Sequence, residues 1–192
     1  MIKYASNAFL ATKISYINEL ANLCEKIDVN IQDISVGMGL DQRIGDRFLR
    51  AGPAYGGSCF PKDTRALIDV AEKYKTDLSI IKSVIKSNNQ RKITLTKRID
   101  KILNNRLKNK NITFLGVTFK PNTDDMREAS SIPMINYLNK KGSKIRYYDP
   151  SGRKMEFDKL KNVKFYSSIS SACIKSDLII IHTEWNAFKL LD

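Results

Sequence analysis

The 192-residue sequence is poor in the residues that hold metals or build disulfides: it has three cysteines and one histidine. Cys24, Cys59 and Cys173 are too scattered for a disulfide framework or a zinc site, so we expect no metal. This cysteine content favours a reducing cytoplasm. No apolar run approaches the ~18–20 residues that span a bilayer, and residues 1–7 lack the apolar segment of a secretory signal. We therefore expect no membrane partner.

Acidic residues are scarce relative to basic ones, because 20 Asp and Glu face 33 Lys and Arg, a formal net charge of +13. Such an excess suggests an anionic partner, such as nucleic acid, a membrane surface or a phosphorylated small molecule. The densest basic stretch, residues 86–110, has cations all around a helix and no interleaved aromatic residues to stack on bases. We interpret it as a solvated helix surface and expect no nucleic-acid partner.

The first hundred residues have apolar positions at three- and four-residue steps, which is typical of amphipathic helices. Helices are expected at 6–28, with Ser6 or Asn7 as the cap, and at 30–38, 61–74 and 79–107. Beyond residue 111, short apolar runs alternate with helical segments, which is typical of a parallel sheet. Strands are expected at 112–117, 144–149, 163–166 and 177–182, and helices at 131–141, 168–175 and from about 185.

The change in pattern predicts an α/β protein with two domains. Residues 1–106 form an all-helical domain that self-associates through its long helices, and residues 107–192 form a partial Rossmann-like parallel-sheet domain. Four strands without a closing helix are few for an α/β domain, so we expect the chain to be a piece of a longer protein.

A glycine-rich segment, AYGGSCFPKD at 54–63, is the strongest candidate for chemistry. Cys59 lies just before a helix that begins near Pro61, and the positive end of a helix lowers the pKa of a thiol. Asp63, about one turn further, is within reach of a water near the sulfur. The residues alone leave two interpretations open: an activated cysteine with a carboxylate helper, or a glycine-rich helix cap in which Cys59 is a small buried residue. Cys24 and Cys173 are on apolar helical faces and are interpreted as inert core thiols.

This segment, together with DQRIG at 41–45, resembles the UDP-glucose/GDP-mannose dehydrogenase family. KYASN at 3–7, GVTFKPNTDDMRE at 116–128, YDP at 148–150 and TEW at 183–185 match further family landmarks in the same order. The resemblance implies the family's central dimerisation domain followed by its nucleotide-sugar domain. The family's NAD fingerprint has no match here, because the first strand is followed only by Gly116. We therefore expect the main NAD-binding domain to be absent from this chain.

The reaction implied by the resemblance is the NAD-dependent oxidation of the C6 hydroxyl of UDP-glucose to the carboxylate of UDP-glucuronate. Cys59 would attack the aldehyde intermediate to form a thiohemiacetal and then a thioester. Lys3 and Asn7 would stabilise the oxyanion, and their i, i+4 spacing places both on one helical face. Asp63 would hold or activate the hydrolytic water. The plain alternatives are a terminal cation for Lys3 and a helix cap for Asn7.

The resemblance also implies binding residues. A segment around the sugar and diphosphate would comprise Arg50, Ala51, Gly52, Pro53, Ala54, Tyr55 and Gly56. Arg43 would reach into the neighbouring subunit's site in a homodimer, and Phe119 and Lys120 would hold the nucleotide. Contacts to NAD would come from Cys59, Phe60, Pro61, Lys62 and Arg127. The structural alternatives are surface cations for Arg43 and Arg127 and a core position for Phe119.

Two other functions stay open at this point. One is GDP-mannose 6-dehydrogenase, since the match of residues 41–63 favours UDP-glucose without excluding GDP-mannose. The other is a non-catalytic dimeric module that binds a nucleotide sugar or nothing. The hexosamine branch of the family tends to lack the pair matched by Lys62 and Asp63. Without an NAD fingerprint, the 192 residues alone are expected to be inactive.

Overall fold

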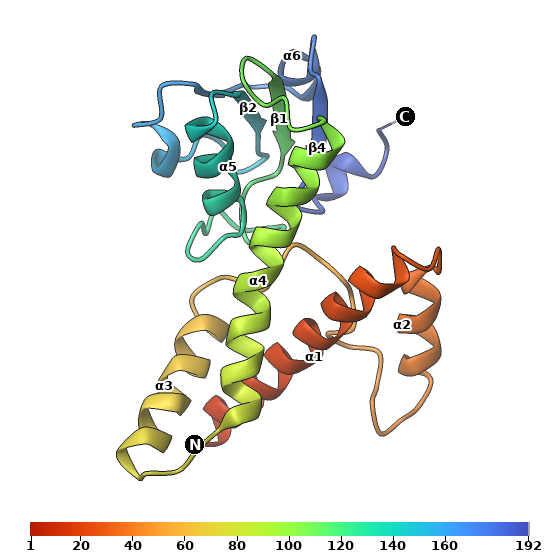
Figure 1. Cartoon of the computed structure of the whole chain (residues 1–192), viewed down its shortest axis with the longest axis vertical. Helices are drawn as coiled ribbons and strands as arrows, with labels where there is room; N and C mark the ends of the chain where they lie inside the picture. Colours follow the sequence, from red (N-terminus) through yellow and green to blue (C-terminus); the bar gives the residue numbers. More distant parts are fainter. Residues whose placement is uncertain (192) are drawn as a thin grey trace. The chain divides into compact units, whose positions relative to one another are not determined.

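The computed structural model describes residues 1–191 and divides the chain into two units (Figure 1). Unit 1 comprises Met1–Arg91 and unit 2 comprises Lys92–Asp192. The division falls inside helix α4 (Ser79–Ile102). Helices precede a parallel sheet along the chain, so the predicted α/β class is confirmed. The domain limits 1–106 and 107–192 stay a prediction.

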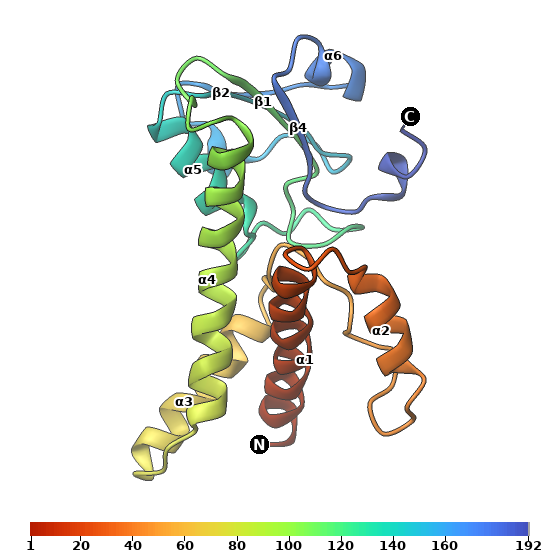
Figure 2. The ribbon, with the colours of Figure 1, turned by 45° about the vertical axis from the view of Figure 1, so that its right-hand side comes forward.

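Unit 1 is helical, with α1 (Ile2–Cys24), α2 (Ile31–Gly39), α3 (Phe60–Lys73) and the first half of α4. In Figure 2, α1 stands between α2 on one side and α3 with α4 on the other. The face of α1 that carries Ala8, Ala11 and Ser15 is buried. These small side chains recur at three- and four-residue steps, which lets neighbouring helices approach closely.

The helix ends differ from those expected. Helix α1 begins at Ile2 with Met1 at its N-cap, so the prediction that Ser6 or Asn7 caps it is wrong. It ends at Cys24 and not at residue 28: residues 25–28 form turns, and Asp28 at their end has a left-handed φ of 55°. Helix α4 ends at Ile102 and not at residue 107, since Asn104 and Asn105 have φ values of 51° and 58°. A helix cannot continue through such residues.

Unit 2 contains the predicted parallel sheet of four strands, in the order β3-β2-β1-β4. The strands are β1 (Asn111–Leu115), β2 (Lys144–Tyr148), β3 (Val163–Phe165) and β4 (Leu178–Ile181). Strand β1 lies between β2 and β4, with Phe114 opposite Tyr147 on one side and Ile180 on the other. Helices α5 (Ser131–Lys140) and α6 (Ile169–Cys173) complete the alternation. The helix expected near residue 185 is only a short 3-10 turn, Asn186–Phe188.

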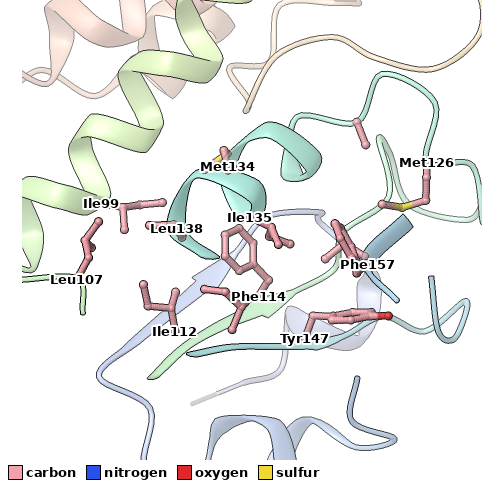
Figure 3. Close-up of a cluster of buried hydrophobic side chains, with 13 residues drawn as sticks. Ile99, Leu107, Ile112, Phe114, Met126, Met134, Ile135, Leu138, Tyr147 and Phe157 are labelled. Atoms are coloured by element: carbon pink, nitrogen blue, oxygen red, sulfur yellow. The ribbon is translucent and has the colours of Figure 1, made fainter. Parts of the chain in front are cut away.

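The core of unit 2 lies between the sheet and α5. Figure 3 shows Ile112 and Phe114 of β1 directed toward Ile135 and Leu138 of α5, and all four are fully buried. Alternate residues of a strand share a face, which explains why positions 112 and 114 serve the same core. Ligands of open α/β sheets bind at the carboxyl ends of the strands. In unit 2, the loops that follow the strands lie at these ends.

Candidate functional site

Cys59 occupies the N-cap of α3, and Pro61 lies in the first turn of that helix as expected. Its thiol is exposed and lies 3.7 Å from the hydroxyl of Ser58. Its carbonyl accepts a hydrogen bond from the backbone N–H of Asp63, at 2.8 Å. The interpretation of Cys59 as a small buried residue is therefore wrong. An exposed thiol at the N-terminus of a helix has the access that a nucleophile needs.

Asp63 joins α3 to α1. Its side chain is fully buried, and Oδ2 accepts a hydrogen bond from Nδ2 of Asn7 at 2.6 Å. Nζ of Lys3 lies 3.6 Å from the same oxygen. Lys3 and Asn7 are four residues apart on α1, so one face of that helix presents an ammonium and an amide to the carboxylate. The structure thus gathers Lys3, Asn7 and Asp63, while the thiol of Cys59 contacts Ser58.

The second carboxylate oxygen of Asp63 is incompletely satisfied. Among residues 1–191, no group donates a hydrogen bond to Oδ1, although it is buried. The ammonium of Lys62 lies 3.9 Å away. A buried carboxylate oxygen without a donor is costly and is usually satisfied by an ordered water. This feature fits the role expected for Asp63 as the holder of a water.

The segment 50–56, expected to wrap the sugar and diphosphate, is anchored by side chains of two helices. Asn18 of α1 accepts from the N–H of Gly52 at 2.8 Å, and Asn88 of α4 bonds both the N–H and the carbonyl of Tyr55. Arg91 of α4 donates to the carbonyl of Gly52 at 3.1 Å. Sequence reasoning missed these anchors. The available signal was a polar residue on an apolar helical stripe, since Asn88 follows Val84 by four residues and both are buried.

Arg43 is held by its neighbour Asp41. The Asp41 carboxylate accepts from the backbone N–H of Arg43 at 2.9 Å and from Nε and Nη2 of its guanidinium at 3.0 and 2.6 Å. These hydrogen bonds lower the pKa of the Asp41 carboxyl, and those from the guanidinium have the larger effect. The Arg43 side chain is 89% exposed, so its guanidinium is oriented and accessible.

In unit 2, Phe119 and Lys120 follow the carboxyl end of β1, where ligands of parallel sheets bind. Phe119 is half-buried against the core, and Nζ of Lys120 lies 5.5 Å from the centre of its ring. Arg127 is held by Asp125 as Arg43 is by Asp41, with Nε and Nη2 donating at 2.9 and 2.8 Å. These side-chain hydrogen bonds lower the pKa of the Asp125 carboxyl.

The β1–β2 end of the sheet lacks the geometry of a dinucleotide site. In such sites an acid that ends the second strand binds ribose hydroxyls. Here Asp149 is buried, and it accepts from the N–H of Val117 at 2.8 Å and of Ser151 at 2.9 Å. Gly116 has a φ of 75°, and a Cβ built there would lie 2.6 Å from Cβ of Thr183. The turn that normally cradles phosphate is therefore filled by the protein itself.

His182 is buried next to this turn. Thr183 Oγ1 donates to the carbonyl of Thr118 at 2.6 Å, so it accepts from Nδ1–H of His182 at 3.1 Å. Nε2 then accepts from the hydroxyl of Ser130 at 2.9 Å. Burial lowers the pKa of His182 to about 4, although the charge of Asp149 opposes this. The ring is therefore neutral and structural at pH 7, with both nitrogens hydrogen-bonded.

Residues 1–191 contain no helix long and apolar enough to cross a membrane. Nor do they gather three or more His, Cys, Asp or Glu side chains that could hold a metal ion. The candidate chemistry of the described chain therefore lies in the thiol, the carboxylate and the cations given above.

Comparisons with known proteins identify relatives of both parts of the chain. Residues 1–90 match the central domain of the UDP-glucose/GDP-mannose dehydrogenase family, and residues 113–192 match its UDP binding domain. UDP-glucose 6-dehydrogenase of Rickettsia typhi is 50% identical over all of this chain, and UDP-glucose 6-dehydrogenase YwqF of Bacillus subtilis is 48% identical over 98% of it.

Among solved structures, a UDP-glucose dehydrogenase from Pyrobaculum islandicum matches the whole chain with a TM-score of 0.93 and 33% identity. The chain covers 44% of that structure and 45% and 43% of the two curated relatives. It thus spans less than half the length of the proteins that it matches.

Proposed function

Because this chain belongs to the UDP-glucose/GDP-mannose dehydrogenase family, we propose that it contributes the catalytic cysteine and the UDP-binding region of an NAD-dependent UDP-glucose 6-dehydrogenase. One observation carries the proposal: a fully buried Asp63 that contacts Asn7 and Lys3, in the first turn of the helix that Cys59 caps. A nucleophile, two groups for an oxyanion and a holder for water are the parts that this oxidation requires.

Cys59 attacks the aldehyde formed by the first oxidation. Its sulfur bonds to C6, and the carbonyl oxygen becomes the alkoxide of a thiohemiacetal. Lys3 and Asn7 stabilise that oxygen: the ammonium supplies positive charge, and the Asn7 amide keeps one N–H after donating the other to Asp63. Loss of hydride from C6 then gives a thioester on Cys59.

Asp63 acts in hydrolysis. A water held at its unsatisfied Oδ1 attacks the thioester carbonyl and gives one proton to Asp63, the carbon–sulfur bond breaks, and the sulfur takes the other proton, so that the carboxylate product leaves the regenerated thiol. The adjacent ammonium groups of Lys3 and Lys62 offset the cost of burying the carboxylate. Because the thiol must stay reduced to react, we propose the cytoplasm as the compartment.

NAD supplies the hydride acceptor for both oxidations when it is bound. We propose that this chain contacts it through Cys59, Phe60, Pro61, Lys62 and Arg127. The side chains of Lys62 and Arg127 are each exposed and cationic, so each can pair with a phosphate, and the exposed thiol leaves its adduct accessible. Because Asp149 and Gly116 are engaged within the protein, we propose that the main NAD-binding domain lies outside these 192 residues.

We propose UDP-glucose as the substrate, held by segment 50–56, Arg43, Phe119 and Lys120. The relatives named above as UDP-glucose 6-dehydrogenases support this choice over GDP-mannose. Initial rates of NADH formation by the full-length enzyme with each sugar nucleotide test it, and faster oxidation of GDP-mannose would reverse the assignment. Steady NADH formation by the purified 192-residue chain would contradict its expected inactivity.

We further propose a homodimer through the long helices. Helix α1 has an exposed apolar stripe at seven-residue steps: Ile2, Phe9, Tyr16 and Leu23 are 86, 66, 52 and 52% exposed. Residues seven apart lie almost above one another on a helix, and such a stripe is typical of a helix–helix interface. A monomer at micromolar concentration in sedimentation experiments would contradict this proposal.

The decisive experiment on the mechanism uses Asp63→Asn in the full-length enzyme. Without the carboxylate, thioester hydrolysis slows and an acyl group accumulates on Cys59, which mass spectrometry detects after mixing with UDP-glucose and NAD⁺. The control is Asp69→Asn, an exposed carboxylate further along α3. An adduct on Cys24 or Cys173, or unchanged turnover of Cys59→Ser, would show that Cys59 is not the nucleophile.

A further inference from the structure

The backbone around segment 50–56 is strained. Ala54 has a φ of 131°, a region that is essentially restricted to glycine, and Phe48 has a φ of 63°. Residues with a Cβ keep such conformations only when surrounding contacts fix them.

Asn88 supplies the main constraint beside Ala54. Its Oδ1 accepts from the N–H of Tyr55 at 2.9 Å, and its Nδ2 donates to the carbonyl of Tyr55 at 3.0 Å. The Asn88 side chain is buried, with an exposed fraction of 4%. Two hydrogen bonds from one planar amide fix the peptide groups on both sides of Tyr55. The peptide group that contains the Tyr55 N–H is the one that joins Tyr55 to Ala54.

Gly52 is held in the same way by two side chains. Asn18 accepts from its N–H at 2.8 Å, and Nε of Arg91 donates to its carbonyl at 3.1 Å. Nη1 of Arg91 also donates to the backbone carbonyl of Asn18 at 3.3 Å, which links α4 to α1. The backbone donors and acceptors at positions 52 and 55 are thus bound by side chains of α1 and α4.

The turn of α4 before Asn88 packs against apolar side chains. Val84, one turn earlier on α4, packs in a cluster with Ala11 and Tyr55, and the ring of Tyr55 lies 6.1 Å from that of Phe60. A buried amide at this place forgoes apolar burial and gains a defined backbone geometry. A buried amide at position 88 therefore indicates that Asn88 positions the backbone of Tyr55.

We propose that Asn88 is a positioning residue that holds the Ala54–Tyr55 backbone in the conformation that binds the nucleotide sugar, with Asn18 and Arg91 fixing Gly52. The inference rests on the proposed function, because it takes segment 50–56 as part of the substrate site. When Asn88 is truncated, the segment relaxes into conformations without the strained φ. Only a fraction of the molecules is then competent to bind, and the apparent affinity falls by that fraction.

The first test measures amide hydrogen exchange in the 192-residue chain without ligand. Asn88→Ala raises exchange at Gly52 and Tyr55 by about tenfold or more, while helix α3 keeps its protection. The control is Asn89→Ala, the same substitution at the next, exposed position. Unchanged exchange at Tyr55 in Asn88→Ala overturns the proposal.

A second variant, Asn88→Asp, covers the case in which the alanine variant fails to fold. Its carboxyl donates to the Tyr55 carbonyl when protonated; when ionised it still accepts from the Tyr55 N–H but repels the carbonyl. The segment then loosens, so the protection factor at Gly52 falls as the pH rises through the pKa of the new carboxyl. A merely structural role produces no such profile confined to this segment, and its absence overturns the proposal.

The closing test uses steady-state kinetics of the full-length enzyme. Asn88→Ala raises KM for UDP-glucose about tenfold or more and leaves KM for NAD⁺ unchanged, whereas Asn89→Ala changes neither. An unmodified enzyme that does not oxidise UDP-glucose overturns the proposed function. An active enzyme in which Asn88→Ala leaves KM for UDP-glucose unchanged overturns the positioning role alone.

Discussion

The two units of the chain differ in the size of their buried apolar clusters. Unit 2 has one large apolar cluster, with Phe114, Ile135 and Leu138 at its centre. Unit 1 has a buried apolar cluster of only Ala11, Tyr55 and Val84. Both units also bury polar side chains, which in unit 1 are Ser15, Asn18, Asp63, Thr64 and Asn88.

We infer that apolar burial mainly stabilises unit 2, whereas buried polar groups position functional segments in unit 1. In unit 2, apolar burial holds a sheet whose carboxyl-end loops carry Phe119 and Lys120. In unit 1, the buried polar groups Asn18, Asp63 and Asn88 contact the segments that we assign to substrate and chemistry. Such groups define a geometry at little net gain in stability. Unit 1 also exposes the apolar stripe of α1, so we expect association to supply part of the burial that it lacks.

The largest effect is expected from the core of unit 2. Phe114→Ala removes a fully buried ring and should lower the free energy of unfolding by about 4 kcal/mol. Urea denaturation followed by the fluorescence of Trp185, the single tryptophan, measures it in the 192-residue chain. Ile179→Ala on β4 is the control, because that side chain is 46% exposed. Equal losses for the two variants would contradict a core centred on Phe114.

Unit 2 should also lose stability in acid through His182. Burial lowers its pKa in the folded state from 6.5 to about 4, so the unfolded state binds the proton first as the pH falls. The contribution is fully present above pH 6.5, and its loss between pH 6.5 and 4 lowers the free energy of unfolding by about 3 kcal/mol.

Urea denaturation at a series of pH values, again followed by Trp185, tests this dependence. His182→Gln should remove that part of the slope, and the carboxylates of the chain provide the remaining slope in both proteins. If the two profiles are parallel between pH 6.5 and 4, His182 is not the responsible group.

A smaller effect is expected on the association of unit 1. Phe9→Ala removes one of the two aromatic rings of the exposed α1 stripe and should weaken the proposed dimer by about 2 kcal/mol, roughly a thirtyfold rise in its dissociation constant. Sedimentation velocity over a concentration series measures this. Tyr74→Ala provides a control, since Tyr74 is an exposed aromatic residue outside the stripe. Similar weakening by both variants would place the interface elsewhere.

Sequence reasoning predicted the order and type of the main helices and strands, because their apolar spacing is strongly periodic. It missed where α1 and α4 end, since Asp28, Asn104 and Asn105 adopt left-handed φ values that no periodicity reveals. The spacing of Lys3 and Asn7 predicted a shared helical face, and the structure places Asp63 against both.

The anchors of segment 50–56 were beyond prediction for a different reason. Asn88 and Tyr55 are 33 residues apart, and Asn18 and Gly52 are 34 apart. A polar residue on an apolar helical face signals a buried hydrogen bond, but it does not name the partner. The partner follows only when the packing of α1 against α3 and the path of the segment are known.

The smallest effect is expected from the strained backbone at Ala54. The comparison with a matched change in unit 2 predicts opposite changes in stability for the two units. Ala54 has a φ of 131°, a strain that costs about 1–3 kcal/mol and that Ala54→Gly removes. The greater conformational freedom of glycine in the unfolded chain offsets about 0.5–1 kcal/mol of that gain. We therefore expect unit 1 to become more stable by about 1 kcal/mol, measured by hydrogen exchange at α1 amides. In unit 2 the matched change, Gly116→Ala, should destabilise, because its Cβ meets Thr183 at 2.6 Å. Loss of stability in Ala54→Gly would show that Ala54 is not strained. Segment 50–56 would then keep its conformation without the hydrogen bonds from Asn88.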